Sequence, residues 1–386
     1  MREPGVQDHR AVGRLPRHPW RRPPAARDGD PPVTTFPRRY RAKQRGVTLV
    51  ELMVALVLGL IVTGAALALF VANRQTYLAT ESLGYLQENA GTSFELMSRD
   101  IREAAGNPCD SSVDTVNVLN DPAGNWYSDF AGGIRGYGGG TPFPDAAFGS
   151  AKGQRVIGTE AIELKSSVAD GVAIVSHQPP SAQFQVNTKD HGLHVGDIAM
   201  ACDFNHGAIF QISNAQPGTN TTIVHNTGAS ISPGNCTKGL GSPRVCTPVG
   251  TSYEFGCRFG GQDPGIDCSL PENRWTAIIA RLRAARWYVG HNGRGGTSLY
   301  RSMLRNNAGT LIVDRDEVAD GVAGMTLAYL SDGAASYVPA AAVGDWSRVV
   351  AVRIDLALAG KLRVGSDGNP LQRHVGHVVA IRSRAP

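Results

Sequence analysis

One uninterrupted apolar run dominates the hydrophobic pattern of the chain. From Leu52 to Ala72 the only polar residue is Thr63, so the run is 21 residues long. A helix of this length measures about 31 Å, close to the roughly 30 Å hydrocarbon core of a bilayer. A secretory signal peptide would have a shorter apolar core followed by a small-residue cleavage site. The pattern therefore predicts a membrane-spanning helix over 47–72, and no later run within 107–386 is long enough to span again.

The helical pattern continues beyond the apolar run. An apolar stripe with spacings of three or four residues follows, formed by Leu83, Leu86, Ala90, Phe94, Met97 and Ile101. Such spacing places the side chains on one face of a helix. Gly106-Asn107-Pro108 predicts its end, because Pro soon after Gly is typical of a helix C-terminus. We expect one helix from about Thr48 to Ala105, with 73–106 as its amphipathic half.

The rest of the chain, 107–386, is predicted to be rich in β-strands. Eleven segments show alternation or β-branched residues: Glu160–Ser167, Val172–Ser176, Asp197–Asp203, Ala208–Ser213, Thr222–His225, Ala285–Val289, Ser298–Ser302, Leu311–Asp314, Met325–Leu330, Val349–Leu358 and Val378–Arg382. No strand–helix alternation is present. We therefore expect an α+β fold, in which the long N-terminal helix packs on an antiparallel sheet with loop insertions.

Two segments are predicted to be insertions. Residues 120–150 hold six Gly at positions 132–140 and indicate a long loop. A glycine-rich phosphate cradle is the alternative, but Gly136–Gly140 lacks both the Lys-Ser/Thr tail and the strand–helix setting of such a site. Residues 231–275 carry four of the six Cys among Gly and Pro, which indicates a cross-linked excursion from the core.

The charge of the chain is unevenly distributed. Residues 1–46 hold 12 Lys+Arg against 4 Asp+Glu, and the remainder holds 26 against 29. The basic balance therefore belongs to the leader, and the body shows no electrostatic footprint of a nucleic-acid-binding protein. The leader is dense in Arg and Pro, which predicts disorder. Its basic residues nearest the apolar run are Arg38, Arg39, Arg41, Lys43 and Arg45, which predicts a cytoplasmic N-terminus and a periplasmic body.

The cysteines predict disulfides. Cys109, Cys202, Cys236, Cys246, Cys257 and Cys268 make an even number on the side expected to be extracytoplasmic. About 15 pairings are open for six cysteines; we expect Cys109–Cys202 plus local bridges within 236–268. Metal binding is the alternative, but no CxxC pair or His cluster accompanies these residues. His191 and His194 share a segment. The alternative is a pair of metal ligands, but we expect them to be surface residues.

The sequence offers no catalytic constellation. It contains no Gly-x-Ser-x-Gly, His-Glu-x-x-His or Walker pattern. Asp314, Asp316 and Asp320-Gly321 are similar to a calcium loop, but Val318 stands where an oxygen ligand is needed. The alternative is a solvated acidic turn before the Met325 strand. We expect neither an enzyme, nor a cofactor, nor a metal site.

Glu51 is the only charged residue between Gly46 and Asn73. A carboxylate in a membrane helix costs up to about 3 kcal/mol at the bilayer centre, so it usually has a role or a partner. The segment Gly46-Val47-Thr48-Leu49-Val50-Glu51 resembles the signal of type IV prepilins. The resemblance implies cleavage after Gly46 by a prepilin peptidase, N-methylation of Val47, and pairing of Glu51 with the N-terminal amine of a neighbouring subunit. The alternative is an ordinary anchor with an interfacial Glu.

Two features depart from that family pattern. Val47 stands where the family usually has Phe, and we expect this to be tolerated because cleavage depends chiefly on the preceding Gly. The leader is unusually long, and we hypothesise that Val33 marks the true start.

Small residues recur every four positions in two stripes, which permits close helix packing: Ala55, Gly59 and Thr63, and Gly64, Ala68 and Ala72.

Further stretches resemble the PilW family of minor pilins. They are Met97–Gly106, Ala201–Gln211, Trp287-Tyr288-Val289, Ser298–Arg301, Val318–Val322 and Trp346–Arg353. The resemblance implies a single-pass inner-membrane protein that joins a minor-pilin complex priming type IV pilus assembly, near the filament tip. Its implied partners are prepilin peptidase, other minor pilins, the major pilin and the assembly platform. The alternatives are a type II secretion minor pseudopilin and a membrane-anchored periplasmic binding or adhesive module.

Overall fold

The computed structural model describes residues 46–384, except 110–112, 131, 144, 229, 262 and 366 and the side chain of residue 259. The predicted leader, apart from Gly46, and the hypothetical start at Val33 lie outside the described residues. The chain divides into two compact units, Met1–Ala65 and Ala66–Pro386. The described part of the first unit is helical from Leu49, and the second contains the remainder of that helix and all the strands.

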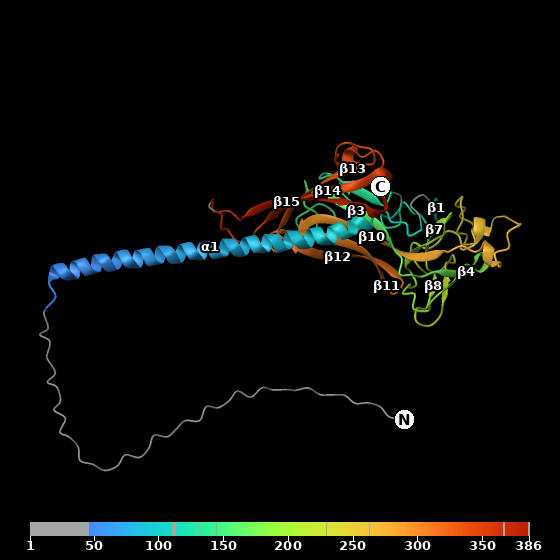
Figure 1. Cartoon of the computed structure of the whole chain (residues 1–386), viewed down its shortest axis with the longest axis horizontal. Helices are drawn as coiled ribbons and strands as arrows, with labels where there is room; N and C mark the ends of the chain where they lie inside the picture. Colours follow the sequence, from blue (N-terminus) through green and yellow to red (C-terminus); the bar gives the residue numbers. More distant parts are fainter. Residues whose placement is uncertain are drawn as a thin grey trace, which may run out of the picture. The chain divides into compact units, whose positions relative to one another are not determined.

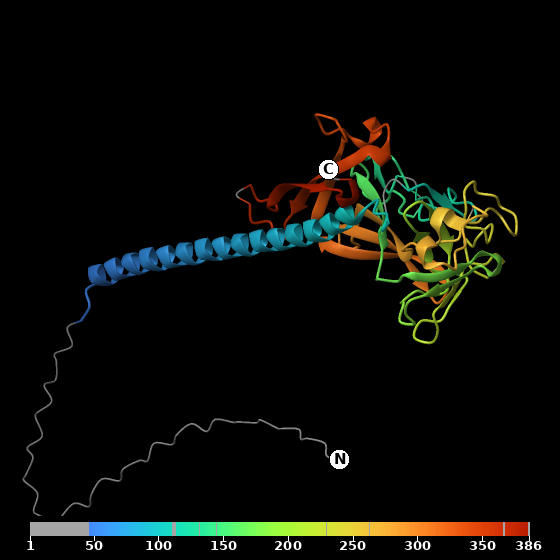
Figure 2. The same ribbon diagram turned by 45° about the vertical axis from the view of Figure 1, so that its right-hand side comes forward.

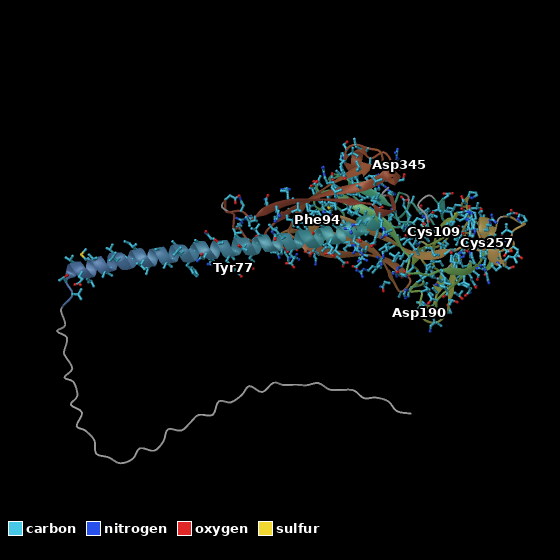
Figure 3. All side chains as sticks on the ribbon, viewed as in Figure 1. Tyr77, Phe94, Cys109, Asp190, Cys257 and Asp345 are labelled. Carbon is cyan, nitrogen blue, oxygen red and sulfur yellow. A yellow bond between two sulfur atoms is a disulfide. The ribbon has the colours of Figure 1, made fainter. Side chains whose placement is uncertain are left out.

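The long helix α1 spans Leu49–Glu103, close to its predicted bounds. Its buried face consists of Ser82, Leu86, Ala90, Ser93, Met97, Ser98 and Ile101. The predicted stripe is thus largely correct, although Leu83 is 43% exposed and Phe94 only partly buried. Figure 3 labels Phe94 on this part of α1 and the exposed Tyr77 further toward its start.

The strands form three sheets. The largest has the order β1 (Thr115–Asn117), β7 (Gly207–Gln211), β6 (Ile198–Cys202), β10 (Ile278–His291), β11 (Thr297–Asn307) and β12 (Thr310–Asp320), with β3 (Ala161–Val168) pairing β10 and β2 (Ile134–Tyr137) pairing β3. The second contains β13 (Val322–Ser331), β14 (Val349–Ala359) and β15 (Gln372–Ala380). The third contains β4 (Ile174–Gln178), β5 (Gln183–Val186), β9 (Thr222–Val224) and β8 (Asn214–Ala215). These pairs are antiparallel, except that β1 and β7 are parallel.

The second half of α1 lies between two groups of strands. In Figures 1 and 2, β13–β15 lie on one side of it and β11 and β12 on the other. Its apolar face joins Trp287, Leu327, Val352 and Leu356 in one core. A second core, with Phe184, Phe210 and Phe255, holds the third sheet against β6 and β7. The structure is therefore the predicted α+β, pilin-like arrangement of one long apolar helix with a mainly β domain.

Several details differ from the sequence predictions. All eleven predicted strands are present, but the short strands β1, β2, β5 and β8 were missed. Residues 120–150 are not one loop, because β2 crosses them and pairs with β3. Gly136 lies on β2 for a packing reason, since an added Cβ would lie 2.3 Å from the Tyr329 hydroxyl. That contact gives the glycine a purely structural explanation.

The acidic segment before the Met325 strand is neither a calcium loop nor a turn. It belongs to β12, which runs through Asp320. Asp314 and Asp316 form ion pairs with Arg305 on the neighbouring β11. Cross-strand charge pairs of this kind satisfy carboxylates that a turn would leave in solvent.

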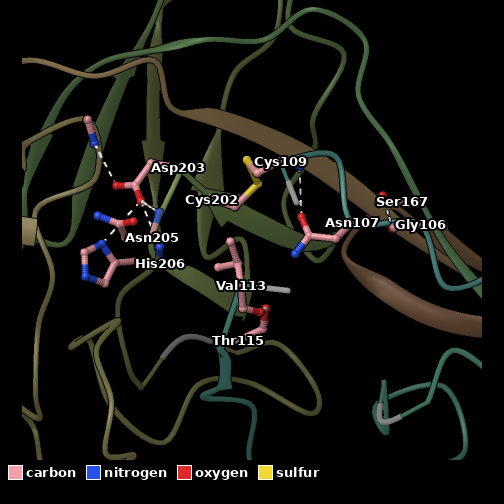
Figure 4. Close-up of a disulfide and its surroundings, with 11 residues drawn as sticks. Gly106, Asn107, Cys109, Val113, Thr115, Ser167, Cys202, Asp203, Asn205 and His206 are labelled. Carbon is pink, nitrogen blue, oxygen red and sulfur yellow. Dashed lines mark hydrogen bonds and ion pairs between the residues drawn. A yellow bond between two sulfur atoms is a disulfide. The ribbon is translucent and has the colours of Figure 1, made fainter. Parts of the chain in front are cut away.

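All six cysteines are paired, as Cys109–Cys202, Cys236–Cys246 and Cys257–Cys268. The first bridge joins the segment after α1 to the end of β6 (Figure 4). Beside it, hydrogen bonds from the backbone N–H groups of Asn205 and His206 to Asp203 close the β6–β7 turn. Burial raises the pKa of Asp203, but the hydrogen bonds from these two residues outweigh it and hold the pKa below its ordinary value.

The Cys-rich segment 231–275 is not only an insertion that extends from the core, because it also packs into the body. It contributes the fully buried Leu240 and the nearly buried Phe255 to the second core. Its described residues include the 3₁₀ turns Arg258–Gly261 and Pro271–Asn273. Other 3₁₀ turns are Pro179–Ser181, Ala340–Ala342, Trp346–Arg348 and Arg382–Arg384. The segment therefore stabilises the body as well as extending it.

Candidate functional site

The first candidate site is the start of α1. Gly46 and Val47 precede the helix, and Val47 is 69% exposed. No described residue lies within 4 Å of a Cβ added at Gly46. The Gly46–Val47 peptide bond, where cleavage is predicted, thus lies outside the helix and is open on the side of the glycine.

Thr48 is the cap of this helix. Its hydroxyl oxygen accepts a hydrogen bond from the backbone N–H of Glu51 at 3.2 Å, while its carbonyl oxygen accepts the N–H of Leu52 at 3.0 Å. Thr-x-x-Glu is the sequence of a capping box, in which the first and fourth residues fix the helix start. The sequence prediction did not include this cap, although the four residues alone could have revealed it. Glu51 also places a negative charge in the first turn, where the helix dipole favours it.

The apolar part of α1 follows directly. α1 is the one helix among the described residues that is long and apolar enough to cross a membrane, and its most apolar window is not buried at all. Thr63, its single polar side chain between Leu52 and Ala72, donates to the carbonyl oxygen of Gly59 at 2.7 Å. This internal hydrogen bond satisfies the hydroxyl without water, as a lipid environment requires.

The two stripes of small residues face no neighbour among the residues that the structure describes. None of those residues lies within 4 Å of a Cβ added at Gly59 or Gly64. Packing within the described part of the chain therefore does not explain these glycines. Close approach of another helix would explain them.

The second candidate site is the contact that holds the end of α1 on the sheet. The Trp287 indole N–H on β10 donates to Asp100 Oδ2 at 2.8 Å, and Arg301 on β11 donates to Asp100 Oδ1 at 2.7 Å. The Arg301 guanidinium also lies 5.4 Å from the centre of the Trp287 ring. Burial raises the pKa of Asp100 above its ordinary value, although Arg301 and the indole N–H act in the opposite direction. We call these three residues the helix anchor.

The helix anchor unites stretches that are far apart in the sequence. Asp100 lies near the end of α1, Trp287 on β10 and Arg301 on β11. A second contact lies nearer the start of α1. Lys361 is 2.9 Å from Asp320 and lies 4.7 Å from the centre of the Tyr85 ring on α1.

The remaining histidine candidates have local partners. His191 Nδ1 accepts from the backbone N–H of Leu193 at 3.1 Å, and the backbone N–H of His194 donates to Asp197 at 2.9 Å. His191 is nearly buried, contrary to the surface position that we expected, whereas the His194 side chain is 61% exposed. Among the described residues, no group of three His, Cys, Asp or Glu side chains has the geometry to hold a metal ion.

Two family models match the chain. The prokaryotic N-terminal methylation motif matches residues 41–67, which include the Gly46–Val47 bond and the helix cap. The type IV pilus-assembly protein W model matches residues 286–379, which include Trp287, Arg301 and the strands around them. Together the two matches support a type IV pilus minor pilin related to PilW. No curated protein and no solved structure was found to match it.

The two matches overlap both candidate sites. The methylation motif and the apolar helix fit a single-pass, membrane-anchored pilin. The families are structural components of pili, and their members interact with other pilins and with assembly components. The helix anchor lies at the junction between the pilin helix and the part of the body that the PilW model matches.

Proposed function

We propose that prepilin peptidase cleaves this chain between Gly46 and Val47 and that the new Val47 amine is then methylated. The open Gly46, the non-helical peptide bond and the match to the methylation motif support the proposal. Five basic residues precede the apolar run, namely Arg38, Arg39, Arg41, Lys43 and Arg45. They favour a cytoplasmic N-terminus and a periplasmic body before assembly.

Glu51 then acts as the register residue of assembly. Within the described residues no ion pair involves Glu51, and its neighbours along α1 are apolar. In a water-poor bundle of pilin helices its carboxylate pairs with the N-terminal amine of an adjacent subunit. A buried charge left without its partner costs about 3–5 kcal/mol, so misregistered packing is disfavoured. The absence of an internal partner for Glu51 in the described structure is the observation on which this proposal chiefly rests.

As a minor pilin, the protein joins other minor pilins and the major pilin on the inner-membrane assembly platform, in a complex that primes the filament and stays near its tip. The large body with three disulfides suits a tip better than a tightly packed shaft. The match to a pilus-assembly family favours this role over that of a type II secretion pseudopilin. Immunogold labelling is expected at filament ends; even labelling along filaments would contradict the tip position.

The first experiment is the intact mass and N-terminal sequence of the protein from cells with and without prepilin peptidase. A chain that begins at Val47 only when the peptidase is present supports the proposal. An uncut chain in both strains would overturn it and leave a membrane-anchored module.

The second experiment substitutes Glu51→Gln. We expect normal cleavage but loss of assembly into filaments, because the amine of the neighbour loses its partner. Glu88→Gln, on the exposed face of α1 beyond the apolar run, is the matched control and is expected to assemble normally. Equal assembly of both variants would refute the role of Glu51.

A further inference from the structure

A cavity of about 820 Å³ lies beside the end of α1, against strands β10–β12. Five arginines line it: Arg99, Arg281, Arg283, Arg301 and Arg305. His194 adds a sixth basic side chain, whereas Asp100 and Asp197 are the only carboxylates among the described residues that line it. The volume falls in the range of about 300–1,000 Å³ that is typical of ligand pockets. We call this site the arginine cavity.

The fold gathers four of these arginines on one face of the large sheet. Arg281 and Arg283 are two residues apart on β10, and Arg301 and Arg305 are four apart on β11, so each pair shares a face. Arg301 lies directly opposite Trp287, which is on the same face of β10 as Arg283. Like charges that gather on neighbouring strands destabilise a sheet. The arrangement therefore carries an energetic cost that a bound anion would offset.

The carboxylates of the chain neutralise these arginines only in part. Arg301 is paired with Asp100, yet its Nε is buried without a hydrogen-bond partner. Arg281 approaches Asp170 only to 4.0 Å. In the described structure, no ion pair or hydrogen bond involves the Arg283 side chain, although it is half-buried. Arg99 pairs with Glu103, and Arg305 pairs with Asp314 and Asp316. Arg283 is therefore the lining arginine that offers a free guanidinium group to the cavity.

The lining also indicates the kind of anion. Leu96, Ile198, Leu304 and Leu311 stand among the arginines, so the cavity suits a ligand with both apolar and anionic groups. A nucleic acid would need a broad basic surface. Here the basic residues concentrate in one cavity, while the chain after residue 46 holds 26 Lys+Arg against 29 Asp+Glu. A short acidic polypeptide segment therefore fits this confined basic site better than a nucleic acid does.

We propose that the arginine cavity binds a carboxylate-bearing peptide segment of a partner protein. Arg guanidinium groups recognise carboxylates through paired, parallel hydrogen bonds, which are stronger than neutral ones. The apolar side chains between them contact the stems of the Glu or Asp side chains. Arg283 provides the free donor fork, and Arg305 joins it while keeping its own contacts to β12.

The test measures binding of a fluorescein-labelled hexaglutamate peptide to the full chain in non-ionic detergent, by fluorescence anisotropy at low ionic strength. We expect saturable binding that Arg283→Glu weakens at least about tenfold, because hydrogen bonds to charged groups are lost and a like charge is introduced. Arg283→Gln, which removes the charge without reversing it, is expected to weaken binding less. It also replaces Arg283→Glu if that variant fails to fold.

Arg373→Glu is the matched control. Arg373 is exposed on β15 and does not line the arginine cavity. Its substitution is therefore expected to leave the affinity for hexaglutamate unchanged. Absence of hexaglutamate binding, or equal weakening by the Arg283 and Arg373 substitutions, would overturn the proposal. Tighter, Arg283-dependent binding of a 12-base-pair duplex DNA would also overturn it in favour of a phosphate ligand. None of these readouts depends on cleavage or filament assembly.

Discussion

The helix anchor provides a quantitative test of how the body is held on α1. Asp100→Ala removes the acceptor of both the Trp287 indole N–H and the Arg301 guanidinium. Trp287 is fully buried, and the Arg301 side chain is only 22% exposed with one nitrogen already unpartnered. The substitution therefore leaves a mostly buried positive charge and a buried donor without partners.

The expected cost follows from these contacts. Removing one partner of a buried ion pair costs about 3–5 kcal/mol, and an unsatisfied buried donor costs about 1–3 kcal/mol. Because Arg301 retains some access to solvent, we expect a loss of about 3–5 kcal/mol in the free energy of unfolding for Asp100→Ala. Asp100→Asn keeps an acceptor for Trp287 and removes a carboxylate that burial disfavours in its charged form. Its expected cost is about 1–2 kcal/mol.

The assay is denaturant unfolding of the full chain in detergent, with disulfides intact, followed by tryptophan fluorescence. Asp355→Ala is the control, since Asp355 is 48% exposed and pairs with the exposed Arg353; it is expected to cost less than about 1 kcal/mol. A cost below about 1 kcal/mol for Asp100→Ala, or a larger cost for Asp100→Asn than for Asp100→Ala, would refute the reasoning.

The pH dependence gives an independent check on the same residue. The pKa of Asp100 is higher in the folded chain than the ordinary value of 3.8, so the folded state binds the proton more tightly. The contribution of this carboxyl to stability therefore falls as pH rises from 3.8 through the folded pKa. In Asp100→Asn this decline should disappear; its persistence would assign it to another group.

Two further predictions concern the body. Gly136→Ala places a Cβ 2.3 Å from the Tyr329 hydroxyl and should lower the free energy of unfolding by about 1–3 kcal/mol. Gly344→Ala is the control and should be neutral, because no described residue lies within 4 Å of its added Cβ. Equal melting temperatures of the two variants would contradict the packing argument. Burial lowers the pKa of His177 from 6.5 to about 3, and its Nε2 lies 3.2 Å from that of the buried His225. Stability should therefore fall as pH drops from 6.5 toward about 3, by up to about 1.4 kcal/mol per pH unit for each histidine. His177→Gln should roughly halve that slope, and an unchanged slope would show that other groups cause it.

The sequence predicted α1 well because periodicity reports directly on burial. Leu86, Met97 and Ile101 are all fully buried. Two buried serines on the same face, Ser93 and Ser98, were missed because a stripe defined by apolar residues excludes them. Their small size allows α1 to approach the strands, and Ser93 donates to the carbonyl oxygen of Asn89 at 2.7 Å, so its polarity costs little.

The acidic strand β12 shows where local pattern is insufficient. Asp314 and Asp316 favour a turn or a cation loop when the sequence is considered alone. They are stable in a strand because Arg305 lies beside them on β11. That pairing depends on register between strands, which no local window of sequence contains. The contact of Asp100 with Trp287 and Arg301 was missed for the same reason, since it joins residues 187 and 201 positions apart.

The start of α1 combines two requirements in four residues. Thr48 caps the start of the helix by accepting the Glu51 N–H, so the helix begins after Val47. If the Gly46–Val47 peptide were helical, it would be held by backbone hydrogen bonds that a protease must break. Glu51 stabilises the same first turn through its charge, and it lies four residues from the amine that cleavage would create. A carboxylate at this position therefore favours the helix start before cleavage and is available for pairing afterwards. Glu51→Asp keeps the charge but shortens the side chain by one methylene, and it therefore separates the two roles. The helix start should remain stable, whereas pairing with the amine of a neighbouring subunit should weaken.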